Sequence, residues 1–193
     1  MIKAPKNWDS VQAASERPKL LPGGYVIEIK KAEPVKAASG YEYLDLTIDI
    51  CEGDFKDFYA EDYKMQQDRK NWRGHVRQGI PKEDAPEDDW TARAFKGLIA
   101  AIEHSNDGYT WDWDESKLKG KIAGCLFRSE EYDFNGFQGW STRPWKLVSA
   151  DRIREGKYQV PNPKGLTGND NAPKNNDGTP VGFEQVSDDD IPF

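Results

Sequence analysis

The sequence is poor in the residues that build disulfides, metal sites and membrane spans. Its 193 residues include two cysteines, Cys51 and Cys125, and two histidines, His75 and His104. Neither cysteine belongs to a CxxC pair and both histidines lie far from them along the chain, which argues against a disulfide framework or a zinc site. No apolar run approaches the length that spans a bilayer, and the N-terminus lacks the apolar stretch of a signal peptide. We therefore expect a cytoplasmic protein that has no metal, no cofactor and no membrane partner.

Acidic residues outnumber basic ones, but much of their excess lies near the C-terminus. The formal net charge is −7, and residues 160–193 hold six acids against two lysines, a net charge of −4. The rest of the chain therefore carries only −3, so the total charge does not exclude a nucleic-acid partner for that part. The charged content of 32% and the hydrophobic content of 36% favour a chain that is unfolded in part.

The last six residues combine charge with an apolar anchor, as a docking peptide does. They are Asp188, Asp189, Asp190, Ile191, Pro192 and Phe193. Three adjacent carboxylates stay solvated and create a local negative field, whereas the terminal aromatic ring suits an apolar pocket. Proline fixes φ in advance and so lowers the entropy that is lost on docking. A solvated acidic tail is the alternative, but the terminal Ile-Pro-Phe favours a partner-binding tip.

The first half of the chain has the pattern of a small antiparallel sheet. Residues 1–20 are polar with scattered apolar positions, and we interpret them as an N-terminal arm. Alternating apolar residues predict strands over 25–31 and 44–50, and a third strand is expected over 55–59. Pro34 should end the first strand. The short turns between the three strands indicate a meander.

A helix and two further strands are expected after Pro81. Asp84 and Glu87 have the spacing of a capping box, and Asn106-Asp107-Gly108 should end the helix. Apolar residues at helical spacing form one stripe, which we interpret as core: Trp90, Ala94, Phe95, Leu98, Ile99 and Ile102. Strands are predicted over 121–132 and 139–148, joined near Asn135-Gly136, a favoured hairpin turn.

This order of elements is that of an OB-fold, a mainly β architecture. An OB-fold is a five-stranded antiparallel barrel with one helix between strands 3 and 4, although other small barrels and sandwiches could share the order. We assign residues 21–157 to this OB-fold-like domain. Past Tyr158 the composition is dominated by Pro, Gly, Asn and Asp. Residues 158–193 are therefore predicted to form a disordered acidic tail, because they cannot bury enough apolar surface to offset their ordering entropy.

Aromatic and basic residues gather in patterns that suit single-stranded DNA. Such DNA is held by cations along its backbone and by aromatic rings on which bases stack. The candidate cations surround one tryptophan: Lys64, Arg69, Lys70, Trp72, Arg73 and Arg77. The other candidate rings lie near the predicted hairpin turn and at the start of the second strand: Tyr132, Phe134, Phe137, Trp140, Tyr41 and Tyr43. These twelve residues form the predicted DNA-binding set.

A packing role is the alternative for each aromatic residue. For Trp72 the two roles are evenly balanced, because the residue could belong to the core of an irregular connection. A hairpin tip is a poor place to bury Tyr132, Phe134 and Phe137 together, so at least one of them is expected to be exposed. Three other tryptophans are interpreted as packing residues: Trp111, Trp113 and Trp145.

The tail and the body of the chain each resemble single-stranded DNA-binding proteins. The C-terminal Asp-Asp-Asp-Ile-Pro-Phe is similar to the tip of the bacterial family, which recruits replication, recombination and repair proteins. Residues 23–157 resemble a family of phage-encoded single-stranded DNA-binding proteins with an OB-fold core, notably in Arg143-Pro144-Trp145 and in 149–156. The resemblance implies a sequence-tolerant protein that protects single-stranded DNA in the bacterial host cytoplasm. It assigns no DNA contact to an individual position.

Two other functions fit parts of the sequence. Asp54, Asp57, Glu61 and Asp62 could bind the metal of a nuclease, but solvated acids are common at a turn and strand end, and no supporting His, Lys or Ser is suitably spaced. A phage adaptor protein could use the tip alone to capture host replication and repair proteins. We expect a single-stranded DNA-binding protein that is not an enzyme. The sequence leaves open whether it forms a homo-oligomer.

Overall fold

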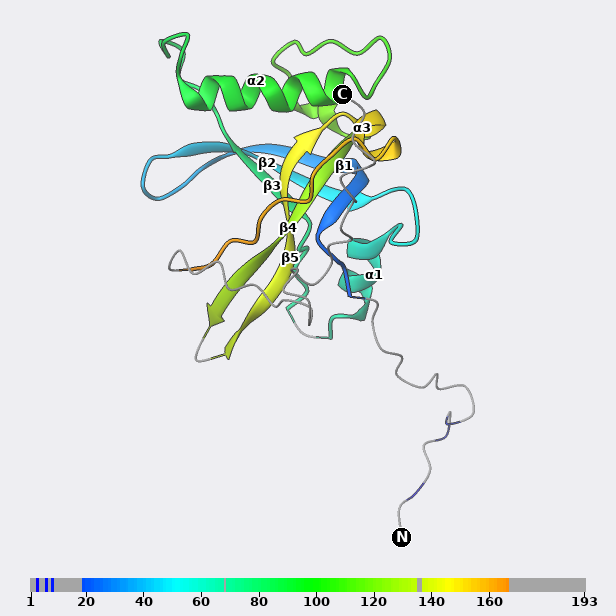
Figure 1. Ribbon diagram of the computed structural model, residues 1–193. Coiled ribbons are helices and arrows are strands. Elements are labelled where there is room, and N and C mark those ends of the chain that lie inside the picture. The colour runs from blue at the N-terminus through cyan, green and yellow to red at the C-terminus, as the bar shows by residue number, and fades with distance from the viewer. Residues whose placement is uncertain are drawn as a thin grey trace.

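Five antiparallel strands form the centre of the computed structural model, which describes residues 3, 6, 8, 19–67, 69–134 and 137–166 (Figure 1). The strands are β1 (Gly23–Lys36), β2 (Glu42–Ile50), β3 (His75–Gly79), β4 (Ile122–Phe134) and β5 (Phe137–Val148). They form one sheet in the order β3-β2-β1-β4-β5. The two end strands of this order, β3 and β5, also approach within 8 Å of each other, Cα to Cα. The fold is therefore mainly β, as predicted.

Within residues 19–166, apart from the three of these that are not described, helical segments accompany the sheet. They are α1 (Phe58–Met65), α2 (Trp90–Glu103), the 3-10 helix η2 (Glu115–Leu118) and α3 (Ala150–Arg154). Helix α2 contacts β3, β4 and β5 and lies across one end of the sheet, whereas α1 packs beside β2 (Figure 1). Within the described ranges, no helix combines the length and the apolar character needed to span a membrane.

Strand β2 confirms the clearest alternation in the sequence. Leu44, Leu46, Ile48 and Ile50 are each at most 3% exposed and form part of the core together with Phe127 of β4. Burial of one such aliphatic side chain contributes roughly 1.5–3 kcal/mol, so this row is a major source of stability. The intervening residues of β2 point to the opposite face of the sheet.

One residue of that opposite face, Asp49, is buried and anchors α1 to the sheet. Its carboxylate accepts hydrogen bonds from the backbone N–H groups of Ile50 at 2.9 Å, Tyr59 at 2.9 Å and Ala60 at 3.1 Å. Tyr59 and Ala60 belong to the first turn of α1, where N–H groups have no partner within the helix. Burial raises the pKa of the Asp49 carboxyl, and the three N–H donors oppose this shift. Asp49, a residue of β2, therefore caps the N-terminal turn of α1.

The predicted third strand over 55–59 is wrong. Residues 55–57 form a turn and α1 begins at Phe58, while the third strand is β3 at His75–Gly79. Gly53 and Asp57 adopt positive φ angles of 78° and 60°, which turn the chain out of the sheet. Phe55 then packs edge-on against Tyr25 of β1, at 5.7 Å between ring centroids. The prediction of a single helix is also incomplete, because α1 and α3 were not expected.

Two smaller predictions about element ends are corrected as well. Strand β1 continues past Pro34 to Lys36, since this part of β1 pairs only with β2 among the described strands and a missing N–H can face the unpaired side. Helix α2 starts at Trp90, and its cap is Asp89, whose carboxylate accepts from the Ala92 N–H at 2.8 Å; the Asp84–Glu87 capping box is not used.

The apolar stripe of α2 is confirmed for its central residues. Phe95, Leu98, Ile99 and Ile102 are buried in the core. Trp90, by contrast, is the first residue of the helix and is 77% exposed. Ala94 is only half-buried, so the buried part of the stripe begins at Phe95.

The described chain continues beyond the boundary predicted at residue 157. Lys164 joins the free edge of β4: its N–H donates to the Ser129 carbonyl and its carbonyl accepts from the Glu131 N–H, both at 2.9 Å. The Leu166 N–H also donates to the Glu131 carboxylate, at 3.1 Å. Lys164 and Leu166 therefore contact β4, although they fall in the stretch from residue 158 on where disorder was expected. The tip and the rest of the tail lie outside the described residues, as does most of the arm over 1–20.

We predict that Asp49→Ala destabilises the protein by about 3 kcal/mol, because it removes the acceptor of two buried N–H groups and one half-buried N–H group. Urea unfolding followed by circular dichroism measures the change. Asp54→Ala is the matched control, since Asp54 is an exposed acid in the neighbouring turn. Equal midpoints for the two variants would contradict the anchoring role of Asp49.

Candidate nucleic-acid interface

The outer face of β2 and β3 carries a row of two aromatic rings and a guanidinium. Because Leu44 and Leu46 point into the core, Tyr43 points outward, and the strand register places Arg77 on the same face. The rings of Tyr41 and Tyr43 stack at 6.2 Å with an interplanar angle of 22°. The Arg77 guanidinium lies 5.6 Å from the centre of the Tyr43 ring. We call Tyr41, Tyr43 and Arg77 the tyrosine–arginine row.

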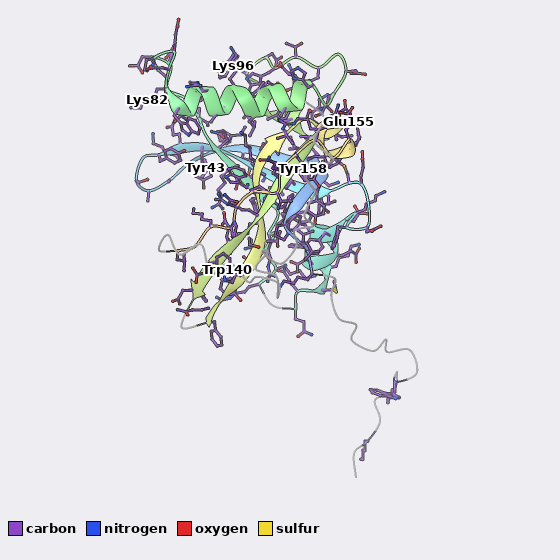
Figure 2. The ribbon with its side chains drawn as sticks, in the orientation of Figure 1. Tyr43, Lys82, Lys96, Trp140, Glu155 and Tyr158 are labelled. Carbon is purple, nitrogen blue, oxygen red and sulfur yellow. The ribbon has the colours of Figure 1, made fainter. Side chains whose placement is uncertain are left out.

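An acidic residue and a histidine complete this face. The Asp45 Oδ1 atom lies 3.0 Å from Nδ1 of His75 and 3.7 Å from Nε of Arg77. The other ring nitrogen of His75, Nε2, lies 3.0 Å from the carbonyl oxygen of Trp72. Figure 2 shows Tyr43 at the β2–β3 part of the sheet. This face therefore contains an anion as well as a cation, and its net charge is lower than the sequence pattern suggested.

The β4–β5 hairpin presents three aromatic rings on one face. Phe134 pairs across the hairpin with Phe137, and Tyr132 pairs with Gly139, so the pleat places all three rings on the same side. Phe134 is 71% exposed and Phe137 is 75% exposed. The Tyr132 ring lies over Gly139, where an added Cβ would come within 2.6 Å of its hydroxyl. We call Tyr132, Phe134 and Phe137 the hairpin aromatic face; the turn residues 135 and 136 lie outside the described residues.

Arginines extend this face toward the body of the molecule. Arg128 and Arg143 are cross-strand partners, and both fall on the side of Phe134 by the same alternation. The Arg128 guanidinium lies 5.1 Å from the centre of the Trp145 ring, and it pairs with Glu130 at 2.8 Å. The predicted set missed both arginines. Counting in steps of two from the expected turn would have placed them beside the aromatic residues.

Three tryptophans differ from their predicted surroundings, and one of them, Trp113, was interpreted as a packing residue but is 70% exposed. Trp140 pairs with Glu131 and so points to the opposite face from the hairpin aromatic face (Figure 2). Trp145 was interpreted as a packing residue, yet it is 43% exposed and supports Arg128. Trp145 lies at the irregularity in the β4–β5 pairing, between the partners of Leu126 and Phe127. The regular alternation of side chains is interrupted there.

For Trp72 the structure favours the packing role. The residue is half-buried, and its indole N–H donates to the Ile48 carbonyl of β2 at 2.9 Å. Its ring lies 6.5 Å from that of Tyr59 and 5.9 Å from that of Tyr63, both on α1. Trp72 therefore fastens the segment after α1 onto the sheet. Tyr63, which is 38% exposed, was missed because α1 was not predicted.

The cations around Trp72 remain on the surface, and several of them have acidic or aromatic neighbours. Lys64 pairs with Glu61 at 2.7 Å, and this hydrogen bond raises the pKa of the Lys64 amine. Lys70 lies 5.5 Å from the centre of the Tyr63 ring, and Arg73 contacts Asp62 at 3.6 Å. Arg69 is exposed and has a φ of 46°. The cluster is basic, but less so than a count of its cations indicates.

Backbone pairing connects this basic cluster with the tyrosine–arginine row. The Ile48 N–H donates to the Gly74 carbonyl at 2.9 Å, so the extended chain begins before β3 itself. Arg73, His75 and Arg77 are each two residues apart along it. The hairpin aromatic face belongs to the opposite end of the sheet order, although β5 approaches β3. Figure 1 shows the β4–β5 hairpin projecting away from α2.

Two of the four carboxylates considered for a nuclease have other partners. Glu61 pairs with Lys64, and Asp62 accepts from the Gln66 side chain at 2.7 Å as well as contacting Arg73. In the described part of the chain, no three His, Cys, Asp or Glu side chains are grouped as a metal site would require.

Comparison with known proteins does not assign the chain to a family. No protein-family model matches the sequence, and no curated protein matches it. The function is therefore inferred from the aromatic and basic groups themselves.

We predict effects of very different size on stability for two aromatic substitutions. Trp72→Ala should lower the free energy of unfolding by about 3 kcal/mol, because it removes buried ring contacts and the bond to Ile48. Phe134→Ala should change it by less than about 0.5 kcal/mol, since the ring is exposed. Urea unfolding of both variants checks the assignment. A Trp72→Ala variant as stable as the wild type would return Trp72 to the candidate base-stacking residues.

Proposed function

We propose that this chain is a sequence-tolerant single-stranded DNA-binding protein. The observation that carries the proposal is the presence of exposed aromatic rings next to arginines on two faces: the tyrosine–arginine row and the hairpin aromatic face. Stacking of a base on an aromatic side chain contributes about 1–3 kcal/mol, and it tolerates any sequence because every base has a π face. Arginines beside the rings would hold the phosphates of the same strand.

The positions of these groups agree with an OB-fold barrel, which we propose as the finer description of the fold. OB-folds bind oligonucleotides on the face of strands 2 and 3 and on the loops between strands 1 and 2 and between strands 4 and 5. Tyr41 lies in the β1–β2 loop, Tyr43 and Arg77 lie on β2 and β3, and Phe134 and Phe137 flank the β4–β5 turn. Each candidate group therefore occupies an element that OB-folds use. The sheet order and the approach of β3 to β5 are also compatible with a barrel.

The sequence resemblances support the same proposal. A body similar to phage-encoded single-stranded DNA-binding proteins would cover exposed strands during replication, recombination and repair in the host cytoplasm. The tip Asp188–Phe193 would recruit the proteins that process this DNA. In this proposal the chain performs no catalysis itself. The adaptor alternative differs in one measurable respect, because it requires no affinity for DNA.

We expect the protein to bind fluorescent oligo(dT) without magnesium and to leave the oligonucleotide intact. Fluorescence anisotropy should show affinity falling linearly with log salt concentration, at a slope of about −0.7 per phosphate neutralised. A blunt duplex of the same length should bind much more weakly, because its bases are not free to stack on the rings. Equal affinity for the duplex would contradict the proposal. Absence of binding would favour the adaptor, and magnesium-dependent cleavage would favour the nuclease.

We expect removal of the tip to separate partner binding from DNA binding. Deleting Asp188–Phe193 should abolish binding to a host replication protein that reads such tips and should leave oligo(dT) affinity equal or slightly higher at low salt. Phe193→Ala alone should weaken the partner complex about thirtyfold, since truncating a buried aromatic anchor typically costs about 2 kcal/mol or more. Asp188→Asn is the control, and its smaller effect should fade with salt. A truncated chain that lost DNA but kept its partner would contradict this division.

A further inference from the structure

Asp45 lies beside the tyrosine–arginine row and contacts two of the groups on this face. A single carboxylate oxygen, Oδ1, lies between the imidazole of His75 at 3.0 Å and the guanidinium of Arg77 at 3.7 Å. The Asp45 side chain is 18% exposed, so it lies at the surface of this face without extending into solvent. The Asp45 carboxylate therefore already places an anion beside the Arg77 guanidinium, the group that would meet a DNA phosphate.

The two contacts of Asp45 differ in strength. The His75 contact has hydrogen-bond length, is largely shielded from solvent, and is supported from behind by the Trp72 carbonyl at 3.0 Å. The Arg77 contact is longer than a hydrogen bond, and the Arg77 side chain is 63% exposed. Exposed ion pairs of this kind contribute about 0–1 kcal/mol. The Arg77 guanidinium can therefore leave Asp45 at little cost in free energy, while the contact between His75 and Asp45 is retained.

We propose that Asp45 occupies the position of a DNA phosphate at Arg77 and thereby limits the affinity for single-stranded DNA. Carboxylate and phosphate are both anionic acceptors that match the guanidinium fork. A strand whose base stacks on the exposed Tyr41 ring brings a backbone phosphate toward Arg77, because Tyr41 stacks on Tyr43 and the guanidinium lies 5.6 Å from the centre of the Tyr43 ring. The phosphate then replaces the carboxylate at Arg77. This inference rests on the proposed function and assigns an affinity-determining role to Asp45.

The test is an oligo(dT) titration of Asp45→Asn over a range of salt concentrations. The variant should bind about two- to fivefold more tightly at low salt, since the competing ion pair is lost. Its salt slope should be steeper by up to about 0.7, because in the wild type the Asp45 carboxylate that leaves Arg77 takes up a cation and so offsets the counterion released by one phosphate. Glu33→Gln is the matched control. Glu33 is the cross-strand partner of Asp45, so Glu33→Gln removes the same charge from the same face. The Glu33 carboxylate, however, pairs with Lys31 at 2.7 Å.

A double-mutant cycle with Arg77→Gln distinguishes local competition from a general charge effect. In the Arg77→Gln background, Asp45→Asn should no longer tighten binding, because no guanidinium remains to be released. Thermal unfolding of every variant confirms that it is folded, and Asp45→Ser replaces Asp45→Asn if the latter is not.

Three results would overturn the inference alone while the wild type still binds oligo(dT). They are an affinity gain for Glu33→Gln equal to that of Asp45→Asn, weaker binding by folded Asp45→Asn, and a gain that persists without Arg77. A wild-type chain that does not bind oligo(dT) at low salt would instead overturn the proposed function, and the role of Asp45 with it.

Discussion

The buried carboxylate of Asp49 determines where the basic part of this chain lies. It holds the first turn of α1 against β2, and the segment after α1 returns to the same strand, where the Trp72 indole donates to Ile48. Both ends of the excursion between β2 and β3 are therefore fixed at neighbouring residues of one strand. Gly74 makes the return possible, because a Cβ there would lie 2.5 Å from the Ile48 carbonyl oxygen. Without these contacts the cations from Lys64 to Arg73 would have no defined position beside the outer face of the sheet.

Alternation along the strands then places some side chains in the core and others on the surface. Strand β2 places its aliphatic residues inside and Tyr43 outside, so the residues that stabilise the domain also orient the proposed DNA-binding face. The β4–β5 hairpin repeats this division further out, with Phe127 in the core and Phe134 exposed near the turn. An interface built this way is rigid at its base, which lowers the entropy lost when a strand of DNA stacks on it.

The sequence was most informative where periodicity was long and least informative where tertiary contacts decided. The β2 alternation and the α2 stripe were predictable because each repeats over several residues with one period. Residues 55–59 were not, because Phe55 alternates like a strand residue but packs against Tyr25 after a turn at positive φ. Trp72 shows the same limit for the site, since its aromatic–basic surroundings suggested base stacking and only the contact with Ile48 reveals packing. Arg143 could have been found by strand alternation from the expected hairpin turn.

The central claim is that single-stranded DNA contacts both the tyrosine–arginine row and the hairpin aromatic face. Photochemical crosslinking of oligo(dT) containing 5-iododeoxyuridine, followed by mass spectrometry of the crosslinked peptides, tests this claim most directly. We predict crosslinks in the peptides that contain Tyr41 or Tyr43 and in those that contain Phe134 or Phe137. Crosslinks confined to the exposed Trp90 at the start of α2, with none in the β4–β5 hairpin, would contradict it.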